Sequence, residues 1–336
     1  MIIDMKSFLG LILLSLLAYQ QALPKTLSQK RGASSVAKAK KAISQKRYKE
    51  ALHELNNSKS EPNAEKLDLL AKAYRGLKDT KNETRTLEVL HLLEPTKLSI
   101  TEELGNAYIK SEQLDKAAET FRAILKEDKK YMAAYEGLYH IFSKTKNNYE
   151  QRTVLQDMQK AFGDNAVVYT KLCRFYSEDS FFEKSLEYCE KAIKKNPRVA
   201  ENYIYAGLDY KGKGLSEKSR NLIHQAAKKF PKSELAQYTA GTQNLEMKNW
   251  ESAKYYFHRC VRANKASDKC WNELAKVALS LKDYSTSLSA FTKACELNHE
   301  HYTEFRNAAS TVKFQNKEKG WSDRFQSAVS RCGKEN

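Results

Sequence analysis

The chain has 336 residues, of which 41% are apolar and 29% are charged, and its formal net charge at pH 7 is +17. A chain of this length exceeds the size at which a single globular core grows efficiently, so several domains or a repeat array are expected. The low content of 5 Pro and 12 Gly, without an obvious strand pattern, favours an all-helical protein and argues against a β-rich one.

The amino-terminal residues are typical of a secretory signal peptide. Residues 8–18 form an apolar run that follows Lys6 and precedes a short polar stretch ending at Ala22. This run is shorter than the about 20 residues that cross a bilayer, so we expect residues 1–22 to be cleaved. A buried amino-terminal helix is the alternative, but the run lacks the polar alternation of such a helix. No later segment is apolar enough to cross a membrane.

A strongly basic stretch follows, because residues 25–49 carry nine Lys or Arg and no acid. We expect residues 23–33 to be a basic linker and residues 34–63 to form a degenerate helical hairpin that packs through Ala39, Ala51 and Leu55. The positive charge suits anionic polymers, lipid headgroups or acidic proteins, and it also keeps an elongated protein soluble.

From residue 64 onward, small residues recur at steps of 34. The series consists of Ala71, Gly105, Tyr139, Cys173, Gly207, Gly241, Ala275 and Ala309, and all but Tyr139 are small. A second series in the same frame is mostly large, with Phe121, Leu155, Cys189, Ile223, Phe257, Phe291 and Phe325. At helical spacing the two series fall on facing sides of two helices. A Gly inside a helix is unfavourable by itself, so we infer that the second helix presses against the first at that position.

The fullest copies of this repeat are Leu104-Gly105-x2-Tyr108 with Ala117-x3-Phe121, and Trp271-x2-Leu274-Ala275 with Ser287-x3-Phe291. The pattern resembles the tetratricopeptide repeat family. The resemblance covers residues 64–332 and implies an all-α, right-handed superhelical solenoid of about eight to nine helical hairpins. Tyr139 and Gln151 depart from the pattern in one repeat, so we expect that repeat to be distorted or loosely packed.

Six cysteines in an exported chain are compatible with disulfides, although six cysteines allow 15 pairings. The repeat frame favours sequential pairing, because consecutive cysteines fall on helices that should be neighbours. The expected pairs are Cys173 with Cys189, Cys260 with Cys270, and Cys295 with Cys332. The alternative is that Cys173, Cys189 and Cys260 serve as small apolar residues.

The sequence contains no motif of a nucleotide-binding loop, a serine hydrolase, a zinc protease or a dithiol redox protein, and we predict neither catalysis nor a cofactor. Cys295, His299 and His301 have a metal-like spacing, but the cysteine adjoins a packing position and the histidines fall in a turn between repeats. We therefore predict no metal. The stretch Lys211-Gly212-Lys213-Gly214 is interpreted as the turn between two helices.

The family typically binds peptides or partner proteins in a concave groove lined by the first helix of each hairpin. The resemblance places these candidate residues in the groove: Arg174, Lys211, Tyr238, Lys269, Asn272, Lys276, Arg306 and Lys313. Bases in the last turn of a helix are explained by the helix dipole alone. Lys269 and Arg306 lie near helix starts, which the dipole does not explain. We therefore favour an acidic peptide or a carboxylate terminus as ligand, with Asn272 binding its backbone.

The sequence thus predicts a non-enzymatic scaffold, exported to a periplasm or secreted, that binds a protein or peptide in a cell-envelope assembly. The alternative is a basic protein that associates with anionic envelope glycan or lipid. Binding to an anionic surface should be lost at physiological salt, whereas groove binding with apolar anchors should persist. Nucleic acid is disfavoured, because export opposes it and the aromatic residues mostly occupy packing positions.

Overall fold

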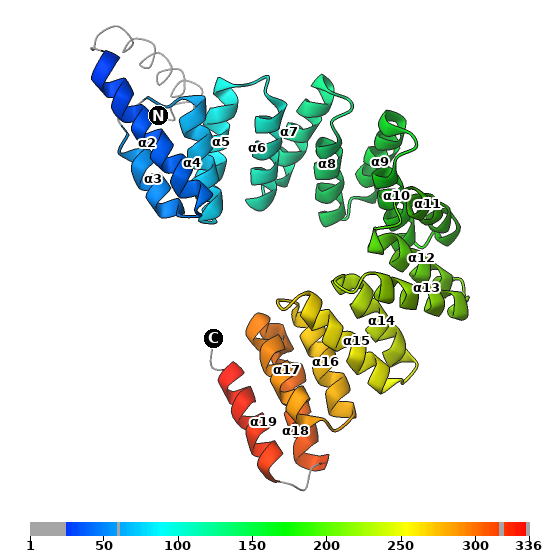
Figure 1. Ribbon diagram of the computed structural model, residues 1–336. Coiled ribbons are helices and arrows are strands. Elements are labelled where there is room, and N and C mark those ends of the chain that lie inside the picture. Colours follow the sequence, from blue (N-terminus) through cyan, green and yellow to red (C-terminus); the bar gives the residue numbers. More distant parts are fainter. Residues whose placement is uncertain (1–24, 59–60, 316–318, 334–336) are drawn as a thin grey trace, which may run out of the picture. The chain divides into compact units, whose positions relative to one another are not determined.

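The computed structural model describes residues 25–58, 61–315 and 319–333, and within these ranges it contains helices and no strand. The predicted signal peptide lies outside the described residues. Helices follow one another as antiparallel hairpins (Figure 1). In chain order they are α2 (Lys25–Ser44), α3 (Tyr48–Asn56), α4 (Ala64–Gly76), α5 (Thr80–Leu93), α6 (Leu98–Lys110), α7 (Leu114–Glu127), α8 (Met132–Lys144), α9 (Asn148–Phe162), α10 (Ala166–Glu178), α11 (Phe182–Lys195), α12 (Ala200–Gly212), α13 (Ser216–Lys229), α14 (Glu234–Glu246), α15 (Trp250–Ala263), α16 (Asp268–Ser280), α17 (Tyr284–Leu297), the short 3-10 helix η2 (His299–His301), α18 (Tyr302–Gln315) and α19 (Lys319–Cys332).

The chain divides into two compact units, Met1–Ala161 (unit 1) and Phe162–Asn336 (unit 2). Helices α2 to α8 lie in unit 1, with nearly all of α9, and helices α10 to α19 lie in unit 2. The expected all-α array of tandem hairpins is confirmed. A continuous core at the carboxyl-terminal end of unit 2 is built around Phe257, Phe291, Phe305 and Phe325, all of which are buried.

Close helix contact at the small-residue positions is confirmed at Gly105 and Gly241. A Cβ atom added at Gly105 would lie 2.8 Å from Cζ of Phe121, and one at Gly241 would lie 2.7 Å from Cε1 of Phe257. Neither distance is compatible with an ordinary contact. The repeat therefore uses Gly where an aromatic ring of the second helix rests against the backbone of the first.

The turns inside the hairpins share a helix-ending motif that the sequence pattern revealed at only one of them. A residue with positive φ recurs at Lys46, Lys78, Glu112, Lys146, Ser180, Gly214, Lys248 and Lys282. After α4, the backbone N–H of Lys78 bonds to the carbonyl of Arg75 and that of Asp79 to the carbonyl of Tyr74, at 3.1 and 3.0 Å. This is a Schellman motif. The predicted turn at residues 211–214 is confirmed, with φ of 77° at Gly214.

The hairpin formed by α8 and α9 is the loosely packed one that Tyr139 predicted. Few Cα atoms of these two helices come within 8 Å of each other, unlike those of the other hairpins in the described part of the chain. Tyr139 and Leu155 are both buried. A tyrosine ring in the position of a small residue keeps the two backbones apart.

The amino-terminal hairpin differs from the expectation at its start. Residues 25–33, expected to be a linker, form the first turns of α2. The segment contains no Pro and is rich in Lys, Gln and Arg, which favour helix. The packing role of Ala39, Ala51 and Leu55 is confirmed, because all three are fully buried.

Candidate functional site

The predicted groove residues lie on the first helices of the hairpins in unit 2, namely α10, α12, α14, α16 and α18. Two of the predicted cations are neutralised by nearby acids. Arg174 donates to Glu178 one turn later on α10, at 2.8 Å. Lys211 on α12 donates to both carboxylate oxygens of Glu246 on α14, at 2.7 and 2.6 Å. These pairs connect or support the first helices and leave little positive charge for a ligand.

A polar network at the start of α18 engages two further predicted residues. Nδ2 of Asn272 donates to Glu304, and the Lys276 ammonium lies 3.0 Å from Oε1 of the same carboxylate. Lys276 also donates to Glu273 at 2.9 Å. Burial alone would lower the pKa of Lys276, but the hydrogen bonds and charges of Glu273 and Glu304 raise it overall. Both side chains are thus committed to contacts within the protein.

The structure differs from the expectation for Asn272. We expected its amide to bind a peptide backbone, but the residue is only 3% exposed. Its donor is taken by Glu304, and its Oδ1 is buried without a hydrogen-bond partner in the described part of the chain. The reason is the acid supplied by the next repeat, 32 residues further on. Asn272 therefore joins α16 to α18 through a buried side chain.

His301 belongs to this network and not to a cluster with Cys295. Its Nε2 lies 3.1 Å from Oδ2 of Asp268, and its Nδ1 lies 3.2 Å from Oε2 of Glu304. Burial alone would raise the pKa of Glu304, but hydrogen bonds from Lys276, His301 and Asn272 lower it. The carboxylate therefore stays charged and satisfied at neutral pH.

Three predicted cations remain available. Lys269, Arg306 and Lys313 are exposed, and within the described ranges none of them has an ion-pair partner. The Arg306 guanidinium lies over the ring of Tyr302, 6.0 Å from the ring centre. Its charge stays open to solvent because the residue is exposed. Phe314 follows Lys313 and is 86% exposed, an unusual position for a phenylalanine that the sequence analysis did not single out. Only this last part of the predicted site combines unpaired charge with exposed apolar surface.

Tyr238, which was predicted to line the groove, packs against a core residue instead of lying fully open to a ligand. Its ring packs edge-on against Phe257 with ring centres 5.9 Å apart, and the residue is half-buried. Burial raises the pKa of its hydroxyl, and the charge of Glu273 raises it further. The side chain therefore supports the contact between α14 and α15 and exposes only part of its surface.

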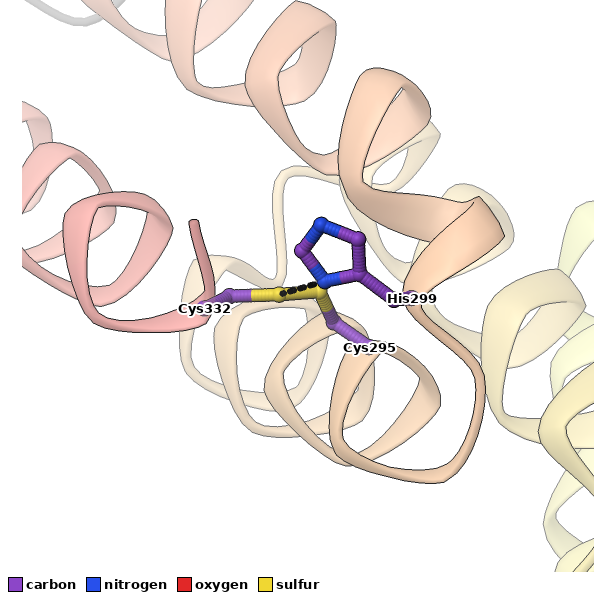
Figure 2. Close-up of side chains that lie close together, drawn as sticks. All are labelled: Cys295, His299 and Cys332. Carbon is purple, nitrogen blue, oxygen red and sulfur yellow. Dashed lines mark hydrogen bonds between the residues drawn. A yellow bond between two sulfur atoms is a disulfide. The ribbon is translucent and has the colours of Figure 1, made fainter. Parts of the chain in front are cut away.

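The six cysteines form disulfides in sequential order in the structure, with Cα–Cα distances of 4.8 Å for Cys173–Cys189, 5.7 Å for Cys260–Cys270 and 6.4 Å for Cys295–Cys332. The third disulfide joins the end of α17 to the end of α19. His299 points toward it, with Nδ1 lying 4.0 Å from Sγ of Cys332 (Figure 2). The sequence pattern grouped Cys295 with His299 and His301, whereas the structure replaces His301 by Cys332.

Unit 1 contains a cavity of about 560 Å³ on helices α4, α6 and α8. Its lining includes Glu102, Glu103 and Glu136, together with Arg75 and His140. Arg75 donates to Glu103 at 2.8 Å and to Glu83 at 2.6 Å. Lys110 also lines this cavity, so its three acids face two cations and a histidine. No helix in the described ranges combines the length and the apolar character needed to cross a bilayer.

Solved structures with a similar fold are tetratricopeptide repeat proteins and proteins of larger assemblies. A tetratricopeptide repeat protein from Parabacteroides merdae is 12% identical, with a TM-score of 0.56 over 78% of this chain and 98% of that one. PilW, a type IV pilus biogenesis factor, is 15% identical, with a TM-score of 0.50 over 70% of this chain and 99% of PilW. The Cut9–Hcn1 hetero-tetramer of the APC/C gives 13% identity and a TM-score of 0.52, over 88% of this chain and 55% of that one.

These likenesses define the fold. No protein-family model matches the sequence, and no curated protein matches it either. The tandem hairpins, the 34-residue frame and the structural neighbours together show that the chain is a tetratricopeptide-repeat protein by fold.

Proposed function

We propose that this protein is an exported, non-enzymatic scaffold that binds a protein or peptide partner through α16 and α18. The observation that carries the proposal is the set of three exposed cations, Lys269, Arg306 and Lys313, which lack ion-pair partners in the described part of the chain. By contrast, Arg75 and Lys211 on other first helices, and Lys276 on α16 itself, are paired with acids. Charge left unpaired on an otherwise neutralised face is suited to a ligand that supplies the missing acids.

The spacing of the cations constrains the partner. Arg306 and Lys313 are seven residues apart on α18, which places them on the same side of the helix and about 10 Å apart along its axis. A peptide in the extended polyproline II conformation advances about 3.1 Å per residue with three residues per turn, so acids three residues apart lie on one side and roughly match this distance. Phe314 offers an apolar contact beside Lys313. The preferred ligand is therefore an extended acidic segment with an apolar residue close to one of its acids.

The proposed export rests on the apolar run at residues 8–18 and on the pairing of all six cysteines. The neighbour PilW is a type IV pilus biogenesis factor, which is compatible with a role in assembly at the cell envelope. We expect the mature protein to begin at residue 23 and to contain no free thiol. Its intact mass, measured with and without reduction, tests both points. A retained amino terminus together with six free thiols would contradict export.

Partner binding is tested with two variants of equal charge. The first replaces Lys269, Arg306 and Lys313 by Gln. The control likewise places Gln at three exposed positions, Lys194, Lys228 and Lys232, which lie outside the predicted groove positions. Both variants and the wild type are used to capture partners from an envelope extract at low and at physiological salt. A discrete protein that survives salt, remains with the control and disappears with the first variant supports the proposal.

The alternative function has a different signature in the same experiment. The net charge of +17 favours association with anionic glycan or lipid, which is a property of the whole surface. Such material should be heterogeneous, should wash off at physiological salt, and should be reduced equally by both variants. That result would favour the alternative function, in which the protein adheres to an anionic surface, over the scaffold function.

A further inference from the structure

Three side chains that could bind a metal meet at the carboxyl-terminal end of unit 2. Cys295 comes from the last turn of α17, His299 from η2 and Cys332 from the last turn of α19 (Figure 2). The two sulfur atoms and a ring nitrogen of His299 all lie within 4.8 Å of one another. In the described part of the chain this is the only group of three or more such ligand atoms. The imidazole is held in place by stacking on Tyr302, with ring centres 5.5 Å apart and planes inclined by 9°.

This disulfide is also the most accessible of the three. Cys173, Cys189, Cys260 and Cys270 are fully buried. Cys295 is 4% exposed and Cys332 is half-buried, at the end of the last described helix. Thiol–disulfide exchange requires access to a sulfur atom, and Cys332 is the only one of the six cysteines that is more than slightly exposed. A dithiol reductant should therefore reach Cys295–Cys332 before the other two pairs.

We propose that reduction of Cys295–Cys332 creates a metal site in which the two thiolates and Nδ1 of His299 bind one soft divalent cation such as Zn²⁺. A dithiol supplies two electrons and two protons, which convert the disulfide into two thiols while the dithiol becomes a disulfide. The cation then displaces the two thiol protons and forms two metal–sulfur bonds and one metal–nitrogen bond. Transfer of two electrons from the thiolates to an added disulfide, which becomes a dithiol, re-forms the Cys295–Cys332 bond and releases the ion. The same cysteines thus hold either a covalent bond or a metal.

The geometry suits this ligand set. In a tetrahedral zinc site the metal–sulfur distance is about 2.3 Å and the metal–nitrogen distance about 2.0 Å, which puts ligand atoms about 3.6–3.8 Å apart. Nδ1 of His299 lies 4.0 Å from Sγ of Cys332, close to the required separation, and the two sulfur atoms can move apart to it once the bond between them is reduced. Thiolate and imidazole ligands select zinc-like ions over Mg²⁺ or Ca²⁺. Three protein ligands leave the fourth position to water or to an external ligand.

The test is a titration of Co²⁺, a spectroscopic substitute for Zn²⁺, into the purified protein before and after reduction with a phosphine. After removal of the reductant under inert gas, we expect one equivalent to bind, with the absorption of thiolate-bound tetrahedral cobalt, and Zn²⁺ to displace it. The oxidised protein should give no such signal. Circular dichroism checks that the reduced protein remains helical.

Variants assign the signal to these residues. Replacing both Cys295 and Cys332 by Ser should abolish binding, and His299→Ala should weaken it by about tenfold or more. The control replaces Cys173 and Cys189 by Ser and should still bind one equivalent. Alkylation of the reduced wild type gives a second measurement that needs no variant, because Zn²⁺ should protect Cys295 and Cys332 from modification. Absence of binding by the reduced, helical protein, or binding that persists without Cys295 and Cys332, would overturn the proposal.

Discussion

The two units share one hairpin packing pattern, but unit 2 adds disulfides to the ion pairs that link its helices. Unit 1 contains no cysteine and uses ion pairs, with the buried Glu83 accepting from Arg75 at 2.6 Å and lying 3.2 Å from the Lys110 ammonium. Unit 2 contains all six cysteines, in three disulfides. One disulfide joins the two helices of a hairpin, and another joins α15 to the following α16.

This difference bears on the surface that remains for a partner. In unit 1 the first-helix cations Arg75 and Lys110 are paired with acids, and both line the cavity there together with three glutamates. In unit 2 disulfides supplement such pairs, and Lys269, Arg306 and Lys313 stay unpaired among the described residues. The ion pairs and disulfides between hairpins, and not the hairpins themselves, therefore decide which charged side chains stay available to a partner.

Removing a disulfide should give the largest effect and should be confined to unit 2. Cys295 and Cys332 are 37 residues apart, and opening a loop of that length costs roughly 3–4 kcal/mol of free energy of unfolding. We expect the double replacement by Ala to accelerate hydrogen exchange of α17 and α19, while α4 to α7 keep their protection. An equal loss of protection from hydrogen exchange in unit 1 and in unit 2 would contradict this prediction.

Glu83→Gln tests the ion pairs of unit 1. The side chain of Glu83 is 3% exposed, whereas those of Arg75 and Lys110 are 36% and 46% exposed. Loss of the buried charge should lower the free energy of unfolding by about 2 kcal/mol, since a hydrogen bond to a charged group contributes more to stability than one between neutral groups. The control is Lys72→Gln, which breaks an exposed pair with Asp68 and should cost less than about 0.5 kcal/mol. Denaturant unfolding of the three proteins provides the comparison.

The packing common to both units is tested at Gly105 and Gly241. Replacement by Ala inserts a methyl group against Phe121 or Phe257, and after the gain in helix propensity we expect a net loss of about 1–2 kcal/mol at each site. Gly320→Ala is the control, because nothing lies within 4 Å of its added Cβ and the residue is exposed in α19. Gly320 is the second residue of α19, where Gly is less unfavourable than in a helix interior, so that variant should gain less than about 0.5 kcal/mol. Unequal losses at the two buried sites would show that the units do not share this contact.

Asp209 in unit 2 gives the smallest predicted effect, which depends on pH. The residue is fully buried, Oδ1 accepts from the Ser177 hydroxyl at 2.6 Å, and Oδ2 lacks a partner among the described residues. Burial raises the pKa of the carboxyl group. A raised pKa in the folded state means that stability is greatest below the unfolded value, about 3.9, and is lost as the pH rises through the folded one.

Asp209→Asn removes this charge. We expect a gain on the order of 1 kcal/mol at pH 7 and a much smaller change near pH 3, where the aspartic acid is already neutral. Thermal melting at both pH values measures the difference. A gain of the same size at both would mean that charge burial is not its cause.

The hairpins could be predicted because their information is local. The 34-residue recurrence placed Gly105 against Phe121 and identified Tyr139 as the residue that loosens α8 against α9, since side-chain direction along a helix follows from spacing alone. The turn at Gly214 was accessible for the same reason. The positive φ of non-glycine residues such as Lys78 and Glu112 was not predicted, because these side chains do not favour that backbone conformation as Gly does.

The state of the candidate site depended on contacts between repeats. Spacing put Asn272 and Lys276 on the first-helix face, but only the structure shows Glu304 beside both, 32 and 28 residues further on respectively. The meeting of His299 with Cys332 likewise spans 33 residues. Periodicity determines which face of a helix a side chain occupies. The offset and rotation between successive hairpins, which arise from packing of the whole array, determine whether that side chain finds a partner or stays free.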